Sequence, residues 1–373
     1  MAARLQYLDR LKVVLTMLVV FHHTAITYGG AGSWYYIDPA REKAAEIVLT
    51  LFTAVNQSFF MGLFFFISGY VTPASFDRKG AGRFLKERVV RFGLPLLGFM
   101  LVIDPLLRFV SGRYPGSFAS YWKEEVLADP LAGVKGFETG PLWFLTALLL
   151  FSAVYALRRL AAKGRPARVS RLTGRRMAAY LAAVAAANFA IRLVYPVGET
   201  VLNLQLAYFP AYIGLYAGGI AAYRGRWLEA LQASAAKRWG RLALVLMAGM
   251  PGVLALGGAL ESGTPAFGGG WTWQAAFYAA VDPLLGLSLS YVLLFVFRER
   301  FNQPARLRSS WLSEHAYTVY LLHALFVTYI GYAFTGLSLP ALLKFAAAGG
   351  AAVLCSYTAA WALRRVPGAK RVL

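Results

Sequence analysis

Cysteine is almost absent from this sequence. Cys355 is the only one, and it lies in the last apolar stretch. A single cysteine excludes a disulfide, a CxxC metal site and a haem attachment motif within one chain. We expect Cys355 to be a small, buried apolar residue. The sequence also shows no group of acidic residues and histidines at metal-ligand spacing, so we predict a protein without a bound metal.

Charge is scarce as well. Only 15% of the residues are charged and 58% are hydrophobic, whereas soluble domains carry about 25% charged residues. The chain is therefore predicted to be a membrane protein. Its net charge of +21 resembles that of a nucleic-acid-binding protein, but the basic residues lie in short loops between apolar runs. This pattern orients membrane helices, so we expect a lipid bilayer and no nucleic acid as partner.

Ten apolar runs predict an all-α, polytopic membrane protein with about ten transmembrane helices. The first run is too long for a signal-peptide core, so we expect it to be a retained first span. No window resembles a soluble domain, and no internal repeat is visible. We therefore predict one integral membrane domain over residues 1–373, without a soluble extracytoplasmic domain. The runs are roughly 8–28, 45–70, 91–111, 141–160, 177–196, 201–223, 241–259, 272–297, 312–333 and 339–363.

The loops between these runs alternate in charge. The N-terminal lead, the C-terminal tail and the loops after runs 2, 4, 6 and 8 hold most of the arginines and lysines, and the other loops hold most of the acids. By the positive-inside rule, both termini are predicted to be cytoplasmic. The predicted outer set of loops contains only a few basic residues: Arg41, Lys43, Arg113, Lys123, Lys135 and Arg192.

Two adjacent histidines, His22 and His23, interrupt the first run near its far end. An ionisable residue at membrane depth is a functional-site hypothesis by default, although a helix–helix hydrogen bond is the alternative. His23 lies about 20 Å beyond Arg10 along a helix axis, in the predicted outer half of the membrane. Lys12, eleven residues before His23, lies on roughly the same helical face, and His22 points about 100° away.

The ninth run contains two more histidines. His315 is expected to be a solvated residue at the membrane boundary, whereas His323 lies deeper, beside Tyr320. Two intramembrane histidines on distant helices indicate a polar pocket better than either one alone. In the third run, Asp104 and Arg108 are four residues apart, so we predict an internal ion pair.

Aromatic and basic clusters mark the predicted membrane boundaries. Trp34 belongs to the outer cluster, which an interfacial aromatic belt explains without any binding role. Ser68 follows an aromatic run, and a tightly packed helix end is the simpler explanation for it. Clustered arginines suit phosphate recognition, although membrane topology alone also predicts basic residues at that place. This cytoplasmic cluster is Arg83, Lys86, Arg88 and Arg91.

Five short motifs, in order along nearly the whole chain, resemble those of the acyltransferase-3 family of membrane acyltransferases. Within it, the chain is most similar to the branch of the glucan biosynthesis protein C type. One departure is a lysine where the family more often has arginine, which keeps the charge but not the bidentate geometry. The motifs are Asp9–Lys12–His23 with Arg10 beside them and Tyr28 following, FFFISGY (64–70), RVVR (88–91), LWFL (142–145) and VYLLH (319–323).

The resemblance implies transfer of an acyl group from cytoplasmic acyl-coenzyme A to a hydroxyl of an extracytoplasmic or membrane-attached glycan. Acetyl is the expected acyl group and succinyl the alternative. His23 would be the general base, or would carry the acyl group itself. The implied location is the inner membrane of a bacterium. Lys12, Arg83, Arg88 and Arg91 would bind the coenzyme phosphates, and Trp143, His323, Tyr320 and Ser68 would line the substrate pocket.

Two other classes of protein fit part of the pattern. A secondary transporter of a glycan or small solute also carries polar residues at mid-membrane, but transporters often show internal repeats, and none is found here. An inactive membrane scaffold does not explain a full motif set. The sequence predicts no oligomeric state, because lipid-facing and partner-facing helix surfaces look alike.

Overall fold

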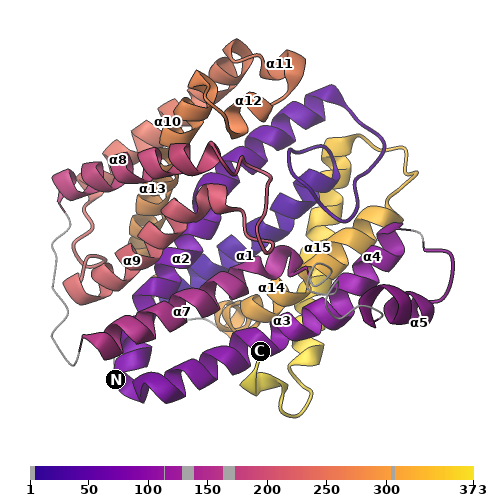
Figure 1. Ribbon diagram of the computed structural model, residues 1–373, viewed down its shortest axis with the longest axis horizontal. Helices are drawn as coiled ribbons and strands as arrows, with labels where there is room; N and C mark the ends of the chain where they lie inside the picture. The colour runs from indigo at the N-terminus through magenta and orange to yellow at the C-terminus, as the bar shows by residue number, and fades with distance from the viewer. Residues whose placement is uncertain (1–4, 113, 128–137, 163–172, 304–306) are drawn as a thin grey trace. The chain divides into compact units, whose positions relative to one another are not determined.

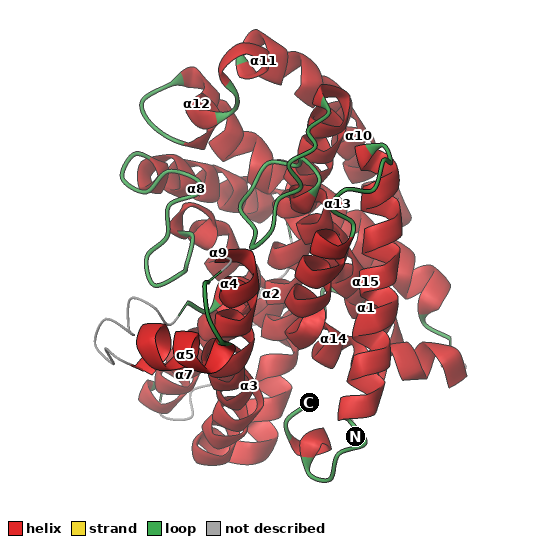
Figure 2. Cartoon of the chain, turned by 90° about the vertical axis from the view of Figure 1, so that its right-hand side faces the viewer, coloured by secondary structure: helices red, strands yellow, loops and turns green. Residues whose placement is uncertain are grey.

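The computed structural model describes residues 5–112, 114–127, 138–162, 173–303 and 307–373. These residues form helices joined by loops, as Figure 2 shows, and their only β-type pairing is an isolated bridge between Val201 and Leu204. The predicted all-α fold is therefore confirmed for the described part of the chain.

The helices follow one another along the chain as labelled in Figure 1. A π-helix over Val89–Gly93, a second over Phe99–Ile103 and a third over Trp122–Leu127 interrupt the regular geometry, and single 3₁₀ turns cover Gly140–Leu142, Leu206–Tyr208 and Ala369–Arg371. The α-helices are α1 (Gln6–Thr27), α2 (Lys43–Arg88), α3 (Leu94–Gly98), α4 (Asp104–Gly112), α5 (Phe118–Tyr121), α7 (Trp143–Ala161), α8 (Gly174–Arg192), α9 (Phe209–Gly225), α10 (Ala233–Leu256), α11 (Ala259–Ser262), α12 (Pro265–Gly268), α13 (Trp273–Phe301), α14 (Leu307–Ala333) and α15 (Ala341–Leu363).

Among the described residues, seven helical stretches are long and apolar enough to cross a membrane. One of them, Lys43–Gly112, has 70 residues and contains both the second and the third predicted runs. These two runs are separated at Gly80, whose φ of 72° and ψ of 169° break the helix. The multi-pass prediction is thus confirmed, whereas the count of ten spans and the side on which the termini lie stay predictions.

The predicted start of the sixth run is wrong by eight residues. The predicted run starts at about residue 201, but α9 begins at Phe209 with Pro210 in its first turn, where proline is tolerated. Leu202 and Asn203 before it have positive φ angles of 51° and 61°, which are incompatible with a right-handed helix. Apolar composition alone does not reveal such a left-handed turn.

The chain divides into two compact units, each built from several stretches. Unit 1 consists of Met1–Leu15, Ala54–Ala81 and Leu157–Arg306, and in it α13 packs against α8 and α10. Unit 2 consists of Thr16–Thr53, Gly82–Ala156 and Leu307–Leu373, and in it α14 packs against α15. The core of unit 2 includes Val20 of α1, Val319 and Val327 of α14, and Ala352 of α15.

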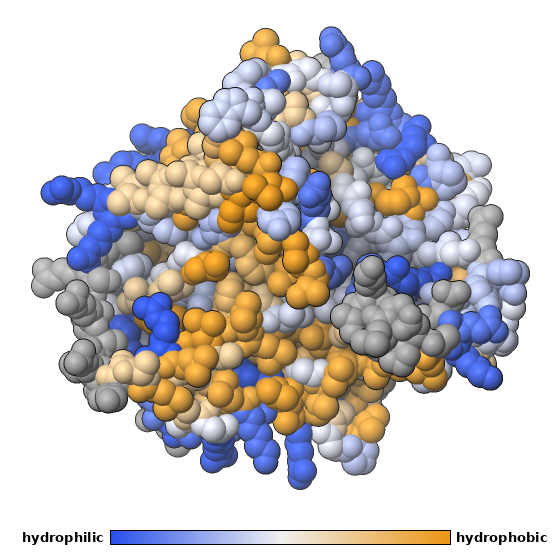
Figure 3. All heavy atoms as spheres, in the orientation of Figure 1, coloured by the Kyte–Doolittle hydropathy of each residue, from blue (hydrophilic) through white to orange (hydrophobic). Residues whose placement is uncertain are grey.

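Apolar side chains also cover much of the surface. Figure 3 shows them over the helices α3 and α7, and the exposed ones in this region of unit 2 are Leu94, Leu97, Val102, Leu150 and Val154. A surface of this kind is what a lipid-facing helix requires.

Two burial predictions are wrong. Cys355 is exposed, because an apolar residue of a membrane helix can face lipid as well as protein, so its hydrophobicity does not predict burial. His315 is buried at 7% exposure, and its Nδ1–H donates to the Trp311 carbonyl oxygen at 2.7 Å. This hydrogen bond within one turn of α14 satisfies a histidine that we expected to be solvated.

Candidate active site

His22 and His23 lie in the last two turns of α1. His22 is buried at 8% exposure, whereas His23 is half-buried. Their rings are nearly perpendicular, at 88°, with centroids 5.4 Å apart. The two adjacent histidines therefore face different surroundings, as their helical spacing predicts.

His323 of α14 lies beside His23, with ring centroids 5.3 Å apart and planes inclined by 25°. It is fully buried. Its Nδ1–H donates to the Tyr320 carbonyl oxygen at 2.5 Å, which leaves Nε2 as the nitrogen with a lone pair in the neutral ring. Nε2 makes no hydrogen bond among the residues that the structure describes, and neither does Nδ1 of His23. The structure thus brings together the two histidines that the sequence places on distant helices.

The ring of Tyr320 also contacts His323. Its ring is nearly parallel to that of His323, at 20° with centroids 5.7 Å apart. Its hydroxyl donates to the Pro141 carbonyl oxygen at 2.7 Å. Phe144 contacts Tyr320 edge to face, and Trp143 contacts Phe144 in the same way. Trp143 is therefore linked to the histidine pair through two intervening rings.

Trp34 lies in the loop after α1 and covers the ring of His23. The two rings are inclined by only 20°, with centroids 3.9 Å apart. The side chain is half-buried and packs against His23, a contact that an interfacial belt does not predict.

Tyr35, next to Trp34, donates its hydroxyl to the Asp104 carboxylate. Burial and the neighbouring carboxylate raise the pKa of Tyr35 well above its usual value, so this hydroxyl stays protonated and remains a donor. Asp104 also accepts from Arg108 Nε at 2.8 Å, which confirms the predicted ion pair. Arg108 in turn contacts Glu138. This network ties the Trp34 loop to the first turn of α4.

The far end of the same loop is held by a buried ion pair. Lys344 Nζ of α15 lies 2.9 Å from the Asp38 carboxylate, and the two side chains are 3% and 2% exposed. Glu42 accepts a hydrogen bond from the Ala341 backbone N–H at 2.9 Å. Tyr28, at the start of the loop, is buried at 1% exposure. The loop is therefore fixed to α15 as well as to α4.

Of the paired arginines, Arg88 is the last residue of α2, and Arg91 lies within the π-helix Val89–Gly93 that follows. Single turns of this kind occur often at functional sites. The Arg88 guanidinium lies over the rings of Phe84 and Phe92 at 5.0 and 5.2 Å. Arg91 is exposed, and its guanidinium lies 5.3 Å from the ring centroid of Tyr317.

Arg83 differs from these two arginines, because it is paired with Glu87 of the next turn at 3.1 Å. It is also exposed. A carboxylate partner leaves less of its positive charge for an anion, so Arg83 is a weaker candidate for phosphate binding than Arg91.

Four residues named from the sequence belong to unit 1. Lys12 contacts Asp9 at 2.6 Å, and Arg10 donates to the Phe301 carbonyl oxygen at 2.7 Å. Ser68 is half-buried in α2, beside Gly69. A Cβ on Gly69 would overlap the Tyr216 carbonyl oxygen of α9, so this segment serves close packing of two helix backbones.

Unit 1 contains a second buried polar region. Arg192 Nη2 of α8 lies 3.1 Å from the Asp282 carboxylate of α13, with the side chains 0% and 5% exposed. The Arg192 guanidinium also lies 5.2 Å from the ring centroid of Tyr208 and 4.7 Å from that of Tyr278. Arg192 is therefore a buried ion-pair residue, and its assignment to an outer loop is wrong.

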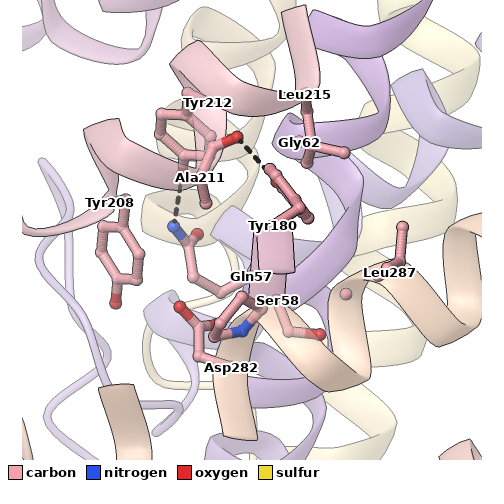
Figure 4. Close-up of a pocket in the computed structure, with 12 residues that line it drawn as sticks. Gln57, Ser58, Gly62, Tyr180, Tyr208, Ala211, Tyr212, Leu215, Asp282 and Leu287 are labelled. Atoms are coloured by element: carbon pink, nitrogen blue, oxygen red, sulfur yellow. Dashed lines mark hydrogen bonds between the residues drawn. The ribbon is translucent and has the colours of Figure 1, made fainter. Parts of the chain in front are cut away.

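A small cavity adjoins this ion pair. Figure 4 shows the Gln57 amide directed at Tyr212, to whose hydroxyl it donates at 3.1 Å, and Asp282 also lines the cavity. The space available to the centre of a water-sized sphere is about 10 Å³, which is room for about one water molecule. The cavity therefore suits internal hydration and is too small for a coenzyme or a sugar.

Two charged residues of these regions were missed as candidates. Lys344 and Asp282 each lie within an apolar run, and a charge at membrane depth is a signal that the sequence does offer. Their partners could not be identified, because 306 residues separate Lys344 from Asp38 and 90 separate Asp282 from Arg192. Trp34 offers no comparable signal, since tryptophan is expected at any membrane boundary.

The helices and their polar interior define the class of protein: a multi-pass membrane protein with a histidine pair enclosed among helices. The chain matches the acyltransferase-3 family, described as Acyltransferase domain, over residues 5–361. It belongs to this family, and so to the membrane acyltransferases.

Among curated proteins, the chain is similar to glucans biosynthesis protein C of Escherichia coli (strain K12), with 30% identity over 156 residues, 41% of this chain and 38% of the relative. It is also similar to glucans biosynthesis protein C of Salmonella schwarzengrund (strain CVM19633), with 30% identity over 182 residues, 45% of this chain and 44% of the relative. The matched region thus spans less than half of these relatives. No solved structure matches the chain.

Proposed function

We propose that this membrane acyltransferase moves an acyl group, acetyl or alternatively succinyl, from cytoplasmic acyl-coenzyme A to a hydroxyl of an extracytoplasmic or membrane-associated glycan. We place the protein in the inner membrane of a bacterium, with both termini in the cytoplasm and the whole chain acting as one domain. His23 is the general base in this proposal.

The observation that carries the proposal is the pair of neighbouring imidazoles, His23 and His323. Each ring has a nitrogen without a partner in the described part of the chain. A general base needs a lone pair aimed at the reacting hydroxyl. His23 is half-buried whereas His323 is fully buried, so His23 is the one that a substrate entering the site would reach.

The donor side of the proposal rests on α14. Tyr317 of this helix donates a hydrogen bond to the Arg91 carbonyl oxygen, and His323 follows six residues later. Six residues of helix rise about 9 Å. The exposed Arg91 and the histidine pair are thus connected by a short length of one rigid helix. A coenzyme whose phosphates bind Arg88 and Arg91 would extend its long thiol arm toward His23.

In the proposed step, the acceptor hydroxyl oxygen attacks the thioester carbon while His23 takes the hydroxyl proton. The new C–O bond forms, the C–S bond breaks, and the proton passes from His23 to the departing thiolate. A positioned histidine contributes about 10²–10⁴-fold to the rate of such a step. The alternative is a ping-pong reaction in which His23 first accepts the acyl group itself.

Purified protein tests the base assignment through release of coenzyme A in the presence of a glycan acceptor. We expect His23→Ala to lower turnover by about 10²–10⁴-fold while acetyl-coenzyme A binding is retained. His22→Ala is the matched control, because it removes the adjacent imidazole, which faces different surroundings. Full turnover by a folded His23→Ala protein would disprove the base assignment.

Mass spectrometry of envelope glycans from deletion and wild-type cells would identify the acyl group and the acceptor together. A difference of one acetyl or one succinyl mass on a glycan is the expected result.

A secondary transporter is the second candidate, and the buried Arg192–Asp282 pair favours it, because charged residues within a membrane often mark solute pathways. The two functions differ in one simple observable. A transporter in detergent solution would release no coenzyme A from an acyl donor.

A further inference from the structure

Trp34 is held in a defined position against His23. The next residue, Tyr35, is hydrogen-bonded to Asp104, and the following one, Tyr36, is hydrogen-bonded to Thr335. Four residues after Trp34, the backbone N–H of Asp38 donates to the Thr27 carbonyl oxygen at 2.9 Å. A loop fixed at so many points presents its tryptophan at a set place rather than as a freely moving side chain.

The three rings of the site form a compact arrangement. Their centroid separations are 3.9 Å from Trp34 to His23, 5.3 Å from His23 to His323 and 6.1 Å from Trp34 to His323, a triangle with nearly a right angle at His23. Near-parallel rings as close as Trp34 and His23 must overlap face to face. The planes are inclined by 20°, 25° and 29° in the three pairs, so His23 is stacked on both Trp34 and His323.

Each of these three side chains carries a buried polar atom without a hydrogen-bond partner in the described ranges. The atoms are Nδ1 of His23, Nε2 of His323 and Nε1 of Trp34. A buried polar group left unpaired is costly, so three such atoms on three contacting rings point to a ligand that supplies the partners. The two imidazoles can accept a proton, but an indole N–H is a donor only.

Acyl transfer requires both kinds of group. When the acceptor hydroxyl attacks the thioester, its proton goes to an imidazole, and the carbonyl oxygen gains negative charge until the C–S bond breaks. That oxygen is stabilised by a fixed hydrogen-bond donor placed before the reaction starts. Resting on the proposed function, we propose that the indole N–H of Trp34 donates to the acyl carbonyl oxygen and stabilises the oxyanion. Trp34 is then a catalytic residue, beside the base.

A purely structural role for Trp34 gives different results. The ring also packs against the core that includes Val20, Val319 and Val327, so its removal would disturb packing. Two replacements distinguish the contribution of the indole N–H from that of the ring, because each keeps an aromatic ring and lacks the N–H. Trp34→Phe keeps a flat apolar ring, and benzothienylalanine incorporated at position 34 keeps the shape of the indole while sulfur replaces the N–H.

We expect both replacements to lower kcat by about 10²–10³-fold, as loss of an oxyanion donor does, with the KM for acyl-coenzyme A unchanged. The matched control is Trp271→Phe, which changes a tryptophan that is 83% exposed in unit 1, and its kcat should equal that of the unaltered protein. Full kcat with benzothienylalanine would overturn the inference, because only the hydrogen-bond donor has been removed.

A second measurement needs no turnover. Protein labelled with ¹⁵N-tryptophan gives one indole N–H signal per tryptophan, and the Trp34→Phe spectrum identifies that of Trp34. Addition of an acetyl-coenzyme A analogue with a ketone in place of the thioester should move this signal downfield. No movement under saturating analogue would overturn the inference. If the signal moves but the unaltered protein transfers no acyl group, the indole N–H of Trp34 binds the carbonyl oxygen and the proposed acyl transfer is disproved.

Discussion

In unit 1, Arg192 and Asp282 carry opposite charges and lie 3.1 Å apart, whereas in unit 2, His23 and His323 are two imidazoles side by side, with ring centroids 5.3 Å apart. Both regions are buried among apolar helices. The ion pair compensates its own charge, and its cavity has room for about one water molecule. Each region keeps polar atoms without a hydrogen-bond partner in the described part of the chain: Nη1 of Arg192 and Oδ1 of Asp282 in the first, Nδ1 of His23 and Nε2 of His323 in the second. The regions therefore differ in charge compensation.

The difference separates two uses of polar groups in a membrane protein. The opposite charges of Arg192 and Asp282 compensate each other, so the pair fixes α8 to α13 within its unit, and removing one partner leaves an isolated buried charge. Removing a histidine ring leaves no isolated buried charge of this kind, so we expect a smaller cost in stability, and in the proposed function the unpaired ring nitrogens contact the substrate. We therefore expect substitutions in the first region to change folding and substitutions in the second to change turnover.

The largest effect is expected from Arg192→Leu. Removing one partner of a buried ion pair costs about 3–5 kcal/mol of unfolding free energy, because the Asp282 carboxylate is left unpaired. Denaturation in detergent measures the loss. The double variant Arg192→Leu/Asp282→Leu should recover most of it, since neither charge then remains. A stable single variant with lost turnover would break the comparison and favour a functional role for the pair.

Lys344→Met tests whether a substitution changes folding because it breaks a buried ion pair or because of the unit in which the residue lies. The Asp38–Lys344 pair lies in unit 2, as the histidines do, but it is a buried ion pair whose side chains are only 2% and 3% exposed. We expect a loss at the lower end of about 3–5 kcal/mol, recovered in part by Asp38→Asn/Lys344→Met. A neutral result in the same denaturation assay would show that this pair is not a stabilising one.

The smallest effect is expected from Arg91→Ala. The side chain is exposed, so its removal should leave unfolding unchanged and weaken acetyl-coenzyme A binding severalfold, with a weaker dependence on salt. Arg83→Ala is the control, because Arg83 is already paired with Glu87 at 3.1 Å, and it should change affinity less. Equal affinities for both variants and the unaltered protein would show that these arginines serve membrane topology only.

Several features of the site follow from sequence. Helical spacing separates His22 from His23, the four-residue interval pairs Asp104 with Arg108, and apolar run length marks the helices. These are local relations, set by the repeat of the helix. The boundary errors have local causes as well: Leu202 and Asn203 adopt left-handed conformations that apolar composition does not reveal.

The sequence by itself determined the all-α membrane class and the family, and it singled out His23 and His323, because run length, charge pattern and short motifs depend on neighbouring residues. Only the tertiary structure decided which distant groups meet: His323 beside His23, Trp34 over the His23 ring, Lys344 with Asp38, and Arg192 with Asp282. These contacts join segments far apart in the chain. The sequence does not predict them, because in an apolar chain every helix face looks equally able to pack against protein or to face lipid.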